Sequence, residues 1–508
     1  MAIISTELIT LRNAGLFLGI LLVYAIFRRV FIRFFHLSNF AGPKLAGYTR
    51  YWLIKTYASK DSANIFLDAN KHFGKLVRIG PNTLLTDDPE INWRVLGPHS
   101  NYRRGKWFDS LRFDPHYTSI ASETDPVKHD ALRWKVTQGY ATKDFPDLEN
   151  VVDSRVSEWI EQMQLKAVDK TSSARSYDLA RNVRMMTLEI AAWVCFSEGL
   201  GFGYEEEERD EFQKSIEENA PYAQYLSTIH GLFSLIYTIC SIPGMKNRMV
   251  LTEHNNPGIG KIMKVSRIVT EKRYAPDAKP VNDMLGSWMK RGLTQHEAET
   301  ETSIALVTGA FPSSAAINVV VLHVATNPLI LSRLRNELDA AVAKGEISTP
   351  ITNAQAMKLP YFQACVSEAL RRFPPITQLR ERVAPPGGDT LDGRYVPAGT
   401  QIGLNAWGLQ RHPCFGDEPE VYRPERWLEA DEKRLMEMNK VQALVFGYGG
   451  TKCLGVTQAM MIINKVLIEL FRTFDIEVVN PMKPWVDQCN GVSFHQDFFV
   501  RLEKRVRG

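Results

Sequence analysis

The stretch from Phe446 to Gly455, which reads F-G-Y-G-G-T-K-C-L-G, constrains the fold of this chain more than any other segment. It combines three loop glycines with a single cysteine, Cys453, and a long apolar segment from Val456 to Phe474 follows at once. Glycines give the backbone the freedom for a tight loop, and the apolar run predicts a helix that begins directly after it. Backbone N–H groups and the positive end of such a helix lower the pKa of a thiol, so the pattern predicts a thiolate at Cys453.

A thiolate attacks electrophiles or binds metals, and Cys453 has no partner cysteine or histidine at zinc-finger spacing. The other five cysteines are scattered without a C-x-x-C pair, which suggests neither a disulfide scaffold nor a zinc site and indicates a reducing compartment. Two interpretations stay open at this point. Cys453 is the single axial ligand of a large cofactor such as heme, or it is a buried structural residue beside a helix.

The composition is that of a globular protein whose body is mostly helical. The chain has 508 residues, 44% of them hydrophobic, and its net charge of +4 is too small to suggest a nucleic-acid partner. No linker divides the body, so we expect a mainly α fold with one large helical domain and a smaller β-rich domain. The clearest predicted helices span Ala63–Phe73, Leu148–Met163, Asp178–Phe196, Glu207–Tyr225 and Tyr361–Phe373. The predicted strands span Leu76–Ile79, Thr83–Thr86, Arg394–Val396, Gln401–Leu404 and Phe498–Leu502.

The N-terminal region predicts a membrane anchor. An uncharged apolar run at residues 14–27 precedes three arginines between residues 28 and 33, and extension of the run to a helix of about 8–27 gives the length of a membrane span. A cleaved signal peptide carries its charges before the apolar run, so we expect an uncleaved anchor over residues 1–37. The positive-inside rule then places the rest of the chain, residues 38–508, in the cytosol. A buried or interfacial helix is the alternative for so short a run.

Two segments between residues 199 and 245 contrast in polarity. The acidic run Glu205–Asp210 is interpreted as the solvated start of a helix. The apolar patch Leu232–Ile242 is interpreted as core or, alternatively, as a surface that dips into the membrane beside the anchor and admits an apolar substrate.

Two charged motifs precede the cysteine loop. Glu368 and Arg371 share one face of a predicted helix that Pro374 and Pro375 end, and Pro424-Glu425-Arg426-Trp427 follows in a loop. Alone, the first is an exposed ion pair and the second a charged turn. If the loop folds back, Arg426 completes a buried network with Glu368 and Arg371, which would brace the cysteine loop.

The three motifs E-x-x-R, P-E-R-W and F-x-x-G-x-x-x-C-x-G follow one another in this order along the chain. With this arrangement the chain resembles the cytochromes P-450, a family of heme-thiolate monooxygenases. The resemblance covers the whole chain, and in detail it is similar to the fungal microsomal members of secondary metabolism. It implies the cytochrome P-450 fold with a single N-terminal anchor in the endoplasmic reticulum membrane. It also implies heme b (iron protoporphyrin IX), O2, an NADPH–cytochrome P-450 reductase and a small apolar substrate, such as a terpenoid, polyketide or alkaloid intermediate.

The resemblance assigns roles to individual residues of this chain. Cys453 matches the iron ligand, Phe446 the aromatic residue beneath the heme, and Gly449 and Gly455 the glycines that let the loop and the next helix approach the porphyrin. The residues that match the structural triad are Glu368, Arg371 and Arg426. The residues that match propionate partners are His129 and Arg133, for which an exposed helix face is the alternative, and Arg382.

This chain departs from the family pattern at two places. Many members have Arg two residues before the cysteine, where this chain has Thr451, with Lys452 beside it. The family's distal helix usually carries an acid followed by an alcohol, which relay protons during oxygen activation. Here the segment reads T-G-A-F-P-S-S from Thr308 to Ser314, so Phe311 stands at the acid position and Pro312 at the alcohol position. Pro312 has no N–H, so we expect a kink and a freed carbonyl at Thr308 that could hold a water molecule.

Three explanations compete for this departure. A hydroxyl of the substrate completes the relay, which we favour; Ser313 or Ser314 substitutes, with water and the Thr308 carbonyl; or the reaction is a desaturation, ring closure or rearrangement. The departure also leaves room for two other classes of protein, a heme-dependent isomerase or dehydratase that needs no electron donor and a heme-binding protein without oxygenase chemistry. By resemblance, the distal pocket would be lined by Trp107, Phe113, Ala310, Phe311, Ile376 and Phe494, although core packing is the alternative for each.

Overall fold

The computed structural model describes residues 13, 16–21, 23–25, 27–28, 36–114, 116–141, 144–167, 176–200, 211–218, 227–229, 231–242, 244–245, 252, 256–489 and 491–505. The acidic run predicted at Glu205–Asp210 lies outside these residues. Of the helix predicted over Glu207–Tyr225, only residues 211–218 are described, and they are helical.

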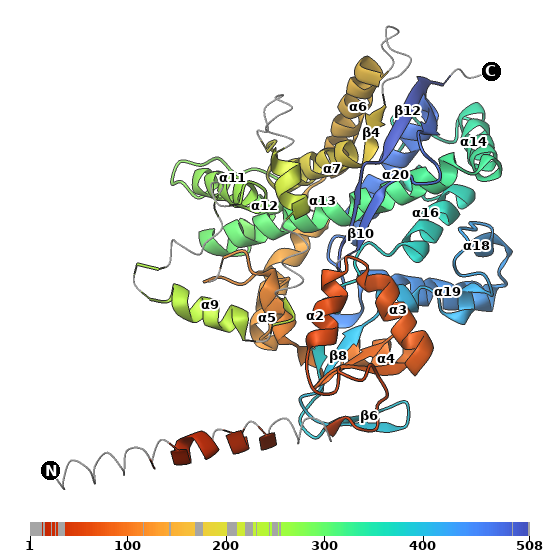
Figure 1. Cartoon of the computed structure of the whole chain (residues 1–508). Helices are drawn as coiled ribbons and strands as arrows, with labels where there is room; N and C mark the ends of the chain where they lie inside the picture. The colour runs from red at the N-terminus through yellow and green to blue at the C-terminus, as the bar shows by residue number, and fades with distance from the viewer. Residues whose placement is uncertain are drawn as a thin grey trace.

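Helices make up most of the described chain (Figure 1). The helices in its first half are α2 Tyr51–Ala58, α3 Ser62–Phe73, α4 Pro89–Leu96, α5 Pro126–Thr137, α6 Leu148–Ala167, α7 Leu179–Phe196 and α9 Leu232–Cys240. Those that follow are α11 Ile259–Arg273, α12 Met284–Lys290, α13 Gln295–Ala325, α14 Pro328–Ala343, α15 Asn353–Ala356, α16 Pro360–Arg372, α17 Ala406–Leu409, α18 Arg426–Glu429, α19 Glu432–Ala443 and α20 Val456–Thr473.

The strands form small sheets at the side of the helices. The largest has the order β1-β2-β8-β5-β3, in which β2 and β8 are parallel and the other pairs are antiparallel. These strands are β1 Leu76–Gly80, β2 Thr83–Thr86, β3 Arg103–Arg104, β5 Arg382–Val383 and β8 Gln401–Leu404. A second sheet has the order β4-β12-β9, with β4 at Tyr177–Asp178, β12 at Phe499–Lys504 and β9 at Phe474–Val478. Two hairpins complete the set of described strands. Strand β10 Val486–Cys489 pairs with β11 Ser493–Gln496, and β6 Asp389–Leu391 pairs with β7 Arg394–Val396.

Helix α13 forms the centre of the helical region. It begins at a capping box in which Thr294 and Glu297 satisfy each other's backbone N–H groups, and it packs against α7, α11, α16 and α20. Its apolar residues lie all round the helix, which is the pattern of a helix buried on every side. Among the described residues, α13 is the one helix long and apolar enough to cross a membrane, but 78% of that apolar window is buried inside the protein, as in a core helix.

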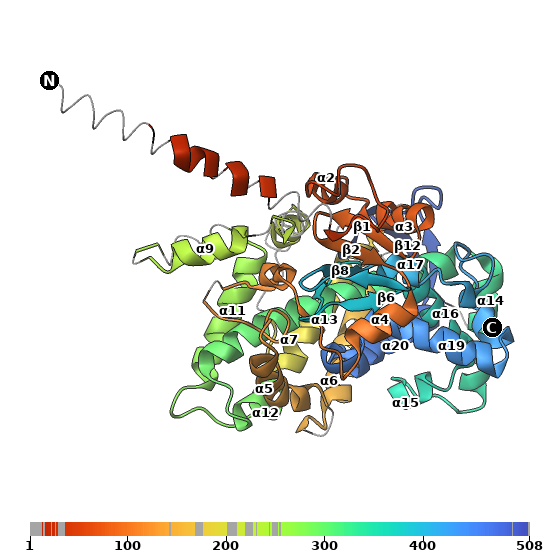
Figure 2. The ribbon, with the colours of Figure 1, turned by 90° about the horizontal axis from the view of Figure 1, so that it is seen from below.

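The predicted N-terminal anchor falls mostly outside the described residues. A shorter apolar helix, Leu16–Ala25, lies there, and its described side chains, among them Leu16, Phe17 and Ile20, are exposed. In Figures 1 and 2 the described turns of this segment stand apart from the globular body, on the side where α9 also lies. The apolar patch predicted at Leu232–Ile242 forms α9, whose Cys240 is buried while Leu235 and Ile242 are more than half exposed.

The main sequence predictions for the body are confirmed. Helices α3, α6, α7 and α16 begin and end within a few residues of the predicted bounds, and so do strands β1, β2, β7, β8 and β12. The helix predicted to follow the cysteine loop is α20. The chain is therefore mainly helical with small β sheets, and the cysteine loop lies where α19 and α20 are joined.

Candidate active site

The cysteine loop is a tight turn held by its own backbone. Two short 3-10 turns, Leu444–Phe446 and Gly449–Thr451, precede Cys453, whose N–H donates to the Phe446 carbonyl over 2.8 Å. Gly449 has a φ of +62°, and a Cβ atom there would lie 2.1 Å from the carbonyl oxygen of Leu96 at the end of α4. A side chain at this position would therefore push the loop away from α4, which explains the need for glycine.

Cys453 differs from the other five cysteines because its side chain is accessible, whereas theirs are buried. The prediction of a lowered thiol pKa is wrong for this structure. Although the side chain is accessible, the surrounding chain removes much of the water near the sulfur and so raises the pKa of Cys453, while the Gly455 N–H and the charges of Arg133 and Arg380 act in the opposite direction. A bound cation rather than the helix terminus would have to hold this sulfur as a thiolate.

Behind the loop, the structure brings Glu368, Arg371 and Arg426 together in one buried cluster. Arg371 donates to both carboxylate oxygens of Glu368, and Arg426 Nε donates to Oε1 over 3.0 Å. The indole N–H of Trp427 and the backbone N–H of Arg423 also donate to the same carboxylate. Burial opposes ionisation of Glu368, but the hydrogen bond from Arg371 and the charges of both arginines hold its pKa below the usual value.

The three predicted propionate partners lie near the cysteine loop. Arg133, on α5, donates to the carbonyl of Lys452 over 3.2 Å, and Arg382, on β5, donates to Thr451 Oγ1 over 2.9 Å. His129 lies one turn before Arg133 and is buried, with Nδ1 3.0 Å from Asp130. Thr451, the residue that departs from the family pattern, thus serves as a hydrogen-bond acceptor for one of the predicted arginines.

Two further arginines in this region were missed by sequence reasoning. Arg104, on β3, and Arg382 both lie against the ring of Phe108, at 4.8 and 4.9 Å from its centroid. Arg380 has a φ of +45°, which costs energy for a residue with a side chain and is typical of functional sites. Burial lowers the pKa of Arg104 and of Arg380 to about 10 in each case. Arginine pairs in Y-R-R-G and L-R-E-R were the available signal, but only the fold turns these side chains toward one place.

Two donors of this arginine cluster have no hydrogen-bond partner within the described part of the chain. They are Arg104 Nε and Arg380 Nε, both buried, and the ring nitrogen His129 Nε2 beside them also has no partner there. A buried donor without a partner costs about 1–3 kcal/mol, more when it is charged, so such a set indicates that an anionic ligand completes it.

The central turns of α13 hold the predicted distal residues. Thr308 is exposed and lies between the half-buried Val307 and Gly309, in a helix whose other central residues are mostly buried. The helix is continuous across Pro312, so the proline does not end it, and the predicted kink stays a prediction. Ser313 donates to the Gly309 carbonyl over 2.8 Å and Ser314 to the Phe311 carbonyl over 2.9 Å. Both serine hydroxyls thus donate their hydrogen bonds to backbone carbonyls of their own helix.

The structure brings some of the predicted pocket residues into contact. Phe311 packs against Phe494 with ring centroids 5.4 Å apart, and Ile376 pairs with Val492 in a short bridge beside Phe494. Trp107 and Phe113 come from a separate segment, in which Trp107 is buried and Phe113 half-buried. Ala310 is fully buried, and its carbonyl accepts from Thr187 of α7, so this residue lies at the contact between two helices.

Comparison with known proteins identifies the family. The model of the cytochrome P-450 family matches residues 48–497. The chain belongs to the cytochrome P-450 family. Its curated relatives include cytochrome P-450 monooxygenase ABA1 of Pyricularia oryzae, 35% identical over 92% of this chain and 93% of that protein. They also include cytochrome P-450 monooxygenase aba1 of Botryotinia fuckeliana (33%, 90% of each) and abl1 of Leptosphaeria maculans (31%, 89% of this chain and 80% of the relative).

This cytochrome P-450 is therefore an oxidoreductase of the monooxygenase family, and its fungal relatives are themselves named cytochrome P-450 monooxygenases. The residues present fit a heme-thiolate cofactor. An accessible cysteine lies in a glycine-rich loop, and buried cationic donors without partners lie close to that loop. Heme carries two carboxylates on one edge, which is the kind of anion that such donors would bind.

Proposed function

We propose that this cytochrome P-450 oxidises an apolar small molecule of fungal secondary metabolism, a terpenoid, polyketide or alkaloid intermediate. It would use O2 and electrons from NADPH–cytochrome P-450 reductase. The observation that carries the proposal is Cys453, the one accessible cysteine of six. The charges of Arg133 and Arg380 act on its thiol and favour the thiolate form. The monooxygenase names of the relatives support the same reaction class.

Heme b is the proposed cofactor, and when bound it supplies the iron at which oxygen is activated. Cys453 would provide the sulfur ligand and Phe446 a ring beside it, while Gly449 and Gly455 keep the loop and α20 close to the porphyrin. A Cβ atom at Gly455 would make an ordinary van der Waals contact with the ring of Tyr140, at 3.7 Å. The propionates would bind the set formed by His129, Arg104, Arg133, Arg380 and Arg382.

For proton delivery we favour a hydroxyl of the substrate, assisted by Thr308. Phe311 and Pro312 carry no proton that they can transfer, and each serine hydroxyl donates to a carbonyl of its own helix. A relay through Ser313 or Ser314 would require one of these hydrogen bonds to open, and both serines are buried, whereas Thr308 makes a hydrogen bond of the same kind but is exposed. Thr308 is exposed, and its hydroxyl donates to the Ile304 carbonyl, so its lone pairs are free to accept from water or substrate.

A second reaction class is favoured by the same departure. A desaturation, rearrangement or dehydration at the heme places different demands on proton delivery than a hydroxylation does. The apolar contact between Phe311 and Phe494 occupies the place where the family usually has an acid, which supports this alternative.

We further propose that residues 1–37 anchor the protein in the endoplasmic reticulum membrane, with the catalytic domain, 38–508, in the cytosol. The helix at residues 16–25, whose described apolar side chains are exposed, and α9, which carries the exposed Leu235, lie on one side of the molecule (Figure 2), which supports a membrane-facing surface. The exposed Lys128 and Lys452 support docking of an acidic reductase near Cys453.

The test of the central proposal is spectroscopic. The reduced protein with carbon monoxide is expected to show the red-shifted Soret band of thiolate ligation, and Cys453→Ala is expected to abolish it. A wild-type protein without that band contradicts the proposal. Reductase-dependent NADPH consumption with candidate substrates then separates a monooxygenase from a rearrangement enzyme, which needs no electrons.

A further inference from the structure

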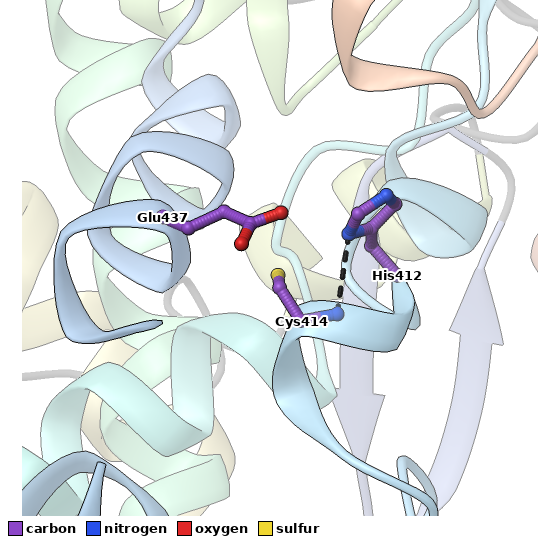
Figure 3. A group of neighbouring side chains, drawn as sticks. All are labelled: His412, Cys414 and Glu437. Carbon is purple, nitrogen blue, oxygen red and sulfur yellow. Dashed lines mark hydrogen bonds between the residues drawn. The ribbon is translucent and has the colours of Figure 1, made fainter. Parts of the chain in front are cut away.

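His412, Cys414 and Glu437 form a cluster of potential metal ligands outside the active site (Figure 3). One ligand atom from each residue lies within 4.8 Å of the other two. Figure 3 shows the imidazole, the thiol and the carboxylate pointing into one space between the loop before α18 and helix α19. Cys414 is buried, His412 is half-buried and Glu437 is exposed, so the cluster opens to solvent on one side.

Two separate elements hold these residues in place. His412 caps the 3-10 turn Pro413–Phe415, and its Nδ1 accepts from the Cys414 N–H over 3.3 Å, a long hydrogen bond that a cation can displace. Glu437 comes from α19, which packs on that turn. Arg434, also on α19, donates to the Cys414 carbonyl and so fixes the loop against the helix from the other side.

We infer that His412, Cys414 and Glu437 bind a thiophilic divalent cation of the zinc class. Sulfur, imidazole nitrogen and carboxylate oxygen are the three ligand types that zinc prefers, and three protein ligands with one water complete a tetrahedral site. Ligand atoms around zinc lie roughly 3.3–3.8 Å apart for bond lengths of about 2.0–2.3 Å, so the cluster must contract by about 1 Å. The exposed Glu437 side chain is free to make that movement. As the sulfur–metal bond forms, the thiol proton leaves to solvent.

Charges of both signs surround the cluster, and three carboxylates act on His412. They belong to Glu437, Asp88 and Glu90, and they favour a cation. Lys75, which is paired with Asp88 at 2.7 Å, opposes it, and so do Arg434 and Arg371, whose charges act on Cys414. Magnesium and calcium would not be expected here, because they prefer oxygen ligands only.

A cation at this site would make the turn that contacts the Glu368 cluster more rigid. Phe415, the residue after Cys414, accepts a hydrogen bond from Arg426 Nη1 through its carbonyl. Cys414 also shares one apolar cluster with Phe415, Trp427 and residues of α19. Since α19 leads directly into the cysteine loop, the bound cation would join the loop's support to the Glu368 cluster, and the expected effect is a higher unfolding temperature.

The experiment uses the heme-loaded protein, whose reduced carbon monoxide spectrum confirms that Cys453 is occupied. Cadmium(II) is the probe, because a cadmium–thiolate bond absorbs in the ultraviolet, away from the heme bands. Equilibrium dialysis with elemental analysis is expected to find about one cadmium ion per chain, with the thiolate band and a rise in unfolding temperature.

Four variants decide the assignment. Cys414→Ser is expected to lose the band and the bound ion, and His412→Asn and Glu437→Gln to weaken binding by about tenfold or more. Asparagine still caps the turn, so His412→Asn separates ligation from folding. Glu432→Gln removes an exposed carboxylate of the same helix outside the cluster and is expected to bind cadmium like the wild type. A wild type that takes up no more cadmium than Cys414→Ser, or a Cys414→Ser protein that keeps the band, overturns the inference.

Discussion

Glu368 and Arg371 are joined by two hydrogen bonds of 2.8 and 2.9 Å, and neither side chain is exposed to solvent. Arg426 adds a second cation to the same carboxylate. The two guanidinium groups use their remaining N–H groups on backbone carbonyls of the segment that leads to α18. The cluster therefore links α16 to this segment through buried charges. If one of these side chains is removed, water cannot reach the others to replace the lost ion pair.

Removal of the Glu368 charge is expected to destabilise the fold strongly. Glu368→Gln leaves two buried guanidinium groups without their anion, and such a loss costs about 3–5 kcal/mol. Urea unfolding of the heme-loaded protein measures the change in free energy. Glu429→Gln is the matched control, because Glu429 pairs with Arg423 at the surface, where an ion pair contributes about 0–1 kcal/mol. Equal losses in the two variants would contradict the structural role of the buried cluster.

Heme retention should depend on Arg104 but not on Arg103. Both residues belong to β3, where neighbouring side chains point to opposite faces, and Arg103 is exposed whereas Arg104 reaches Phe108. We expect Arg104→Gln to lose heme about tenfold faster, the effect of one charged hydrogen bond of about 1.5 kcal/mol. The rate of heme transfer to apomyoglobin measures the loss, and Arg103→Gln should match the wild type. An unchanged rate in Arg104→Gln would remove this residue from the proposed propionate set.

Much of the fold could be predicted because its long elements carry clear periodicity. Helix α7 has an apolar face over eighteen residues, and β2 and β8 are short runs rich in branched residues between turn signals. The parallel pairing of β2 with β8 was not predictable, since it joins Thr83 to Gln401 across most of the chain. Strands β3 and β5 are two residues long each, too short for any alternation to be visible.

The candidate site was predictable where residues stand in ordered motifs, and not elsewhere. Glu368, Arg371 and Arg426 were grouped from their motifs, and the structure places them in contact. The approach of Arg380 to Cys453 depends on a left-handed backbone conformation that the sequence does not announce. The direction of the pKa of Cys453 was mispredicted, because the effect of the helix end was weighed without the burial that opposes it. The cluster around Cys414 combines residues 412, 414 and 437, a spacing that matches no metal motif.

The serines of α13 should be dispensable for turnover, and Thr308 should not be. Ser313→Ala and Ser314→Ala each remove a hydroxyl that donates to a carbonyl of the helix, so product formation is expected to stay within about twofold of the wild type. Thr308→Val keeps the shape of an exposed side chain but removes its hydroxyl. We expect the product formed per NADPH to fall by at least about tenfold. This threshold is lower than the usual contribution of a general acid, about 100-fold or more, because a substrate hydroxyl would still supply part of the relay. Loss of product in Ser313→Ala with normal turnover in Thr308→Val would reverse the assignment.

The stability of the protein should fall as the pH rises toward 8, because of Glu301. This carboxyl is 1% exposed, and burial raises its pKa to about 8, with the Ile120 N–H and Arg104 acting against the shift and Glu297 adding to it. Since the unfolded chain ionises at about 4.5 and the folded one near 8, the folded state holds an extra proton between these values. Its free energy of unfolding then falls by up to about 1.4 kcal/mol per pH unit in that window. Glu301→Gln keeps an acceptor for Ile120 and should remove this slope, as urea unfolding at pH 5, 6.5 and 8 would measure. Glu297→Gln should lower the free energy of unfolding by a constant amount over this pH range, because hydrogen bonds from Thr294 and Lys135 outweigh burial and lower the pKa of Glu297, so that its contribution is fully present above pH 4.5. A slope that persists unchanged in Glu301→Gln would show that another group titrates in this range.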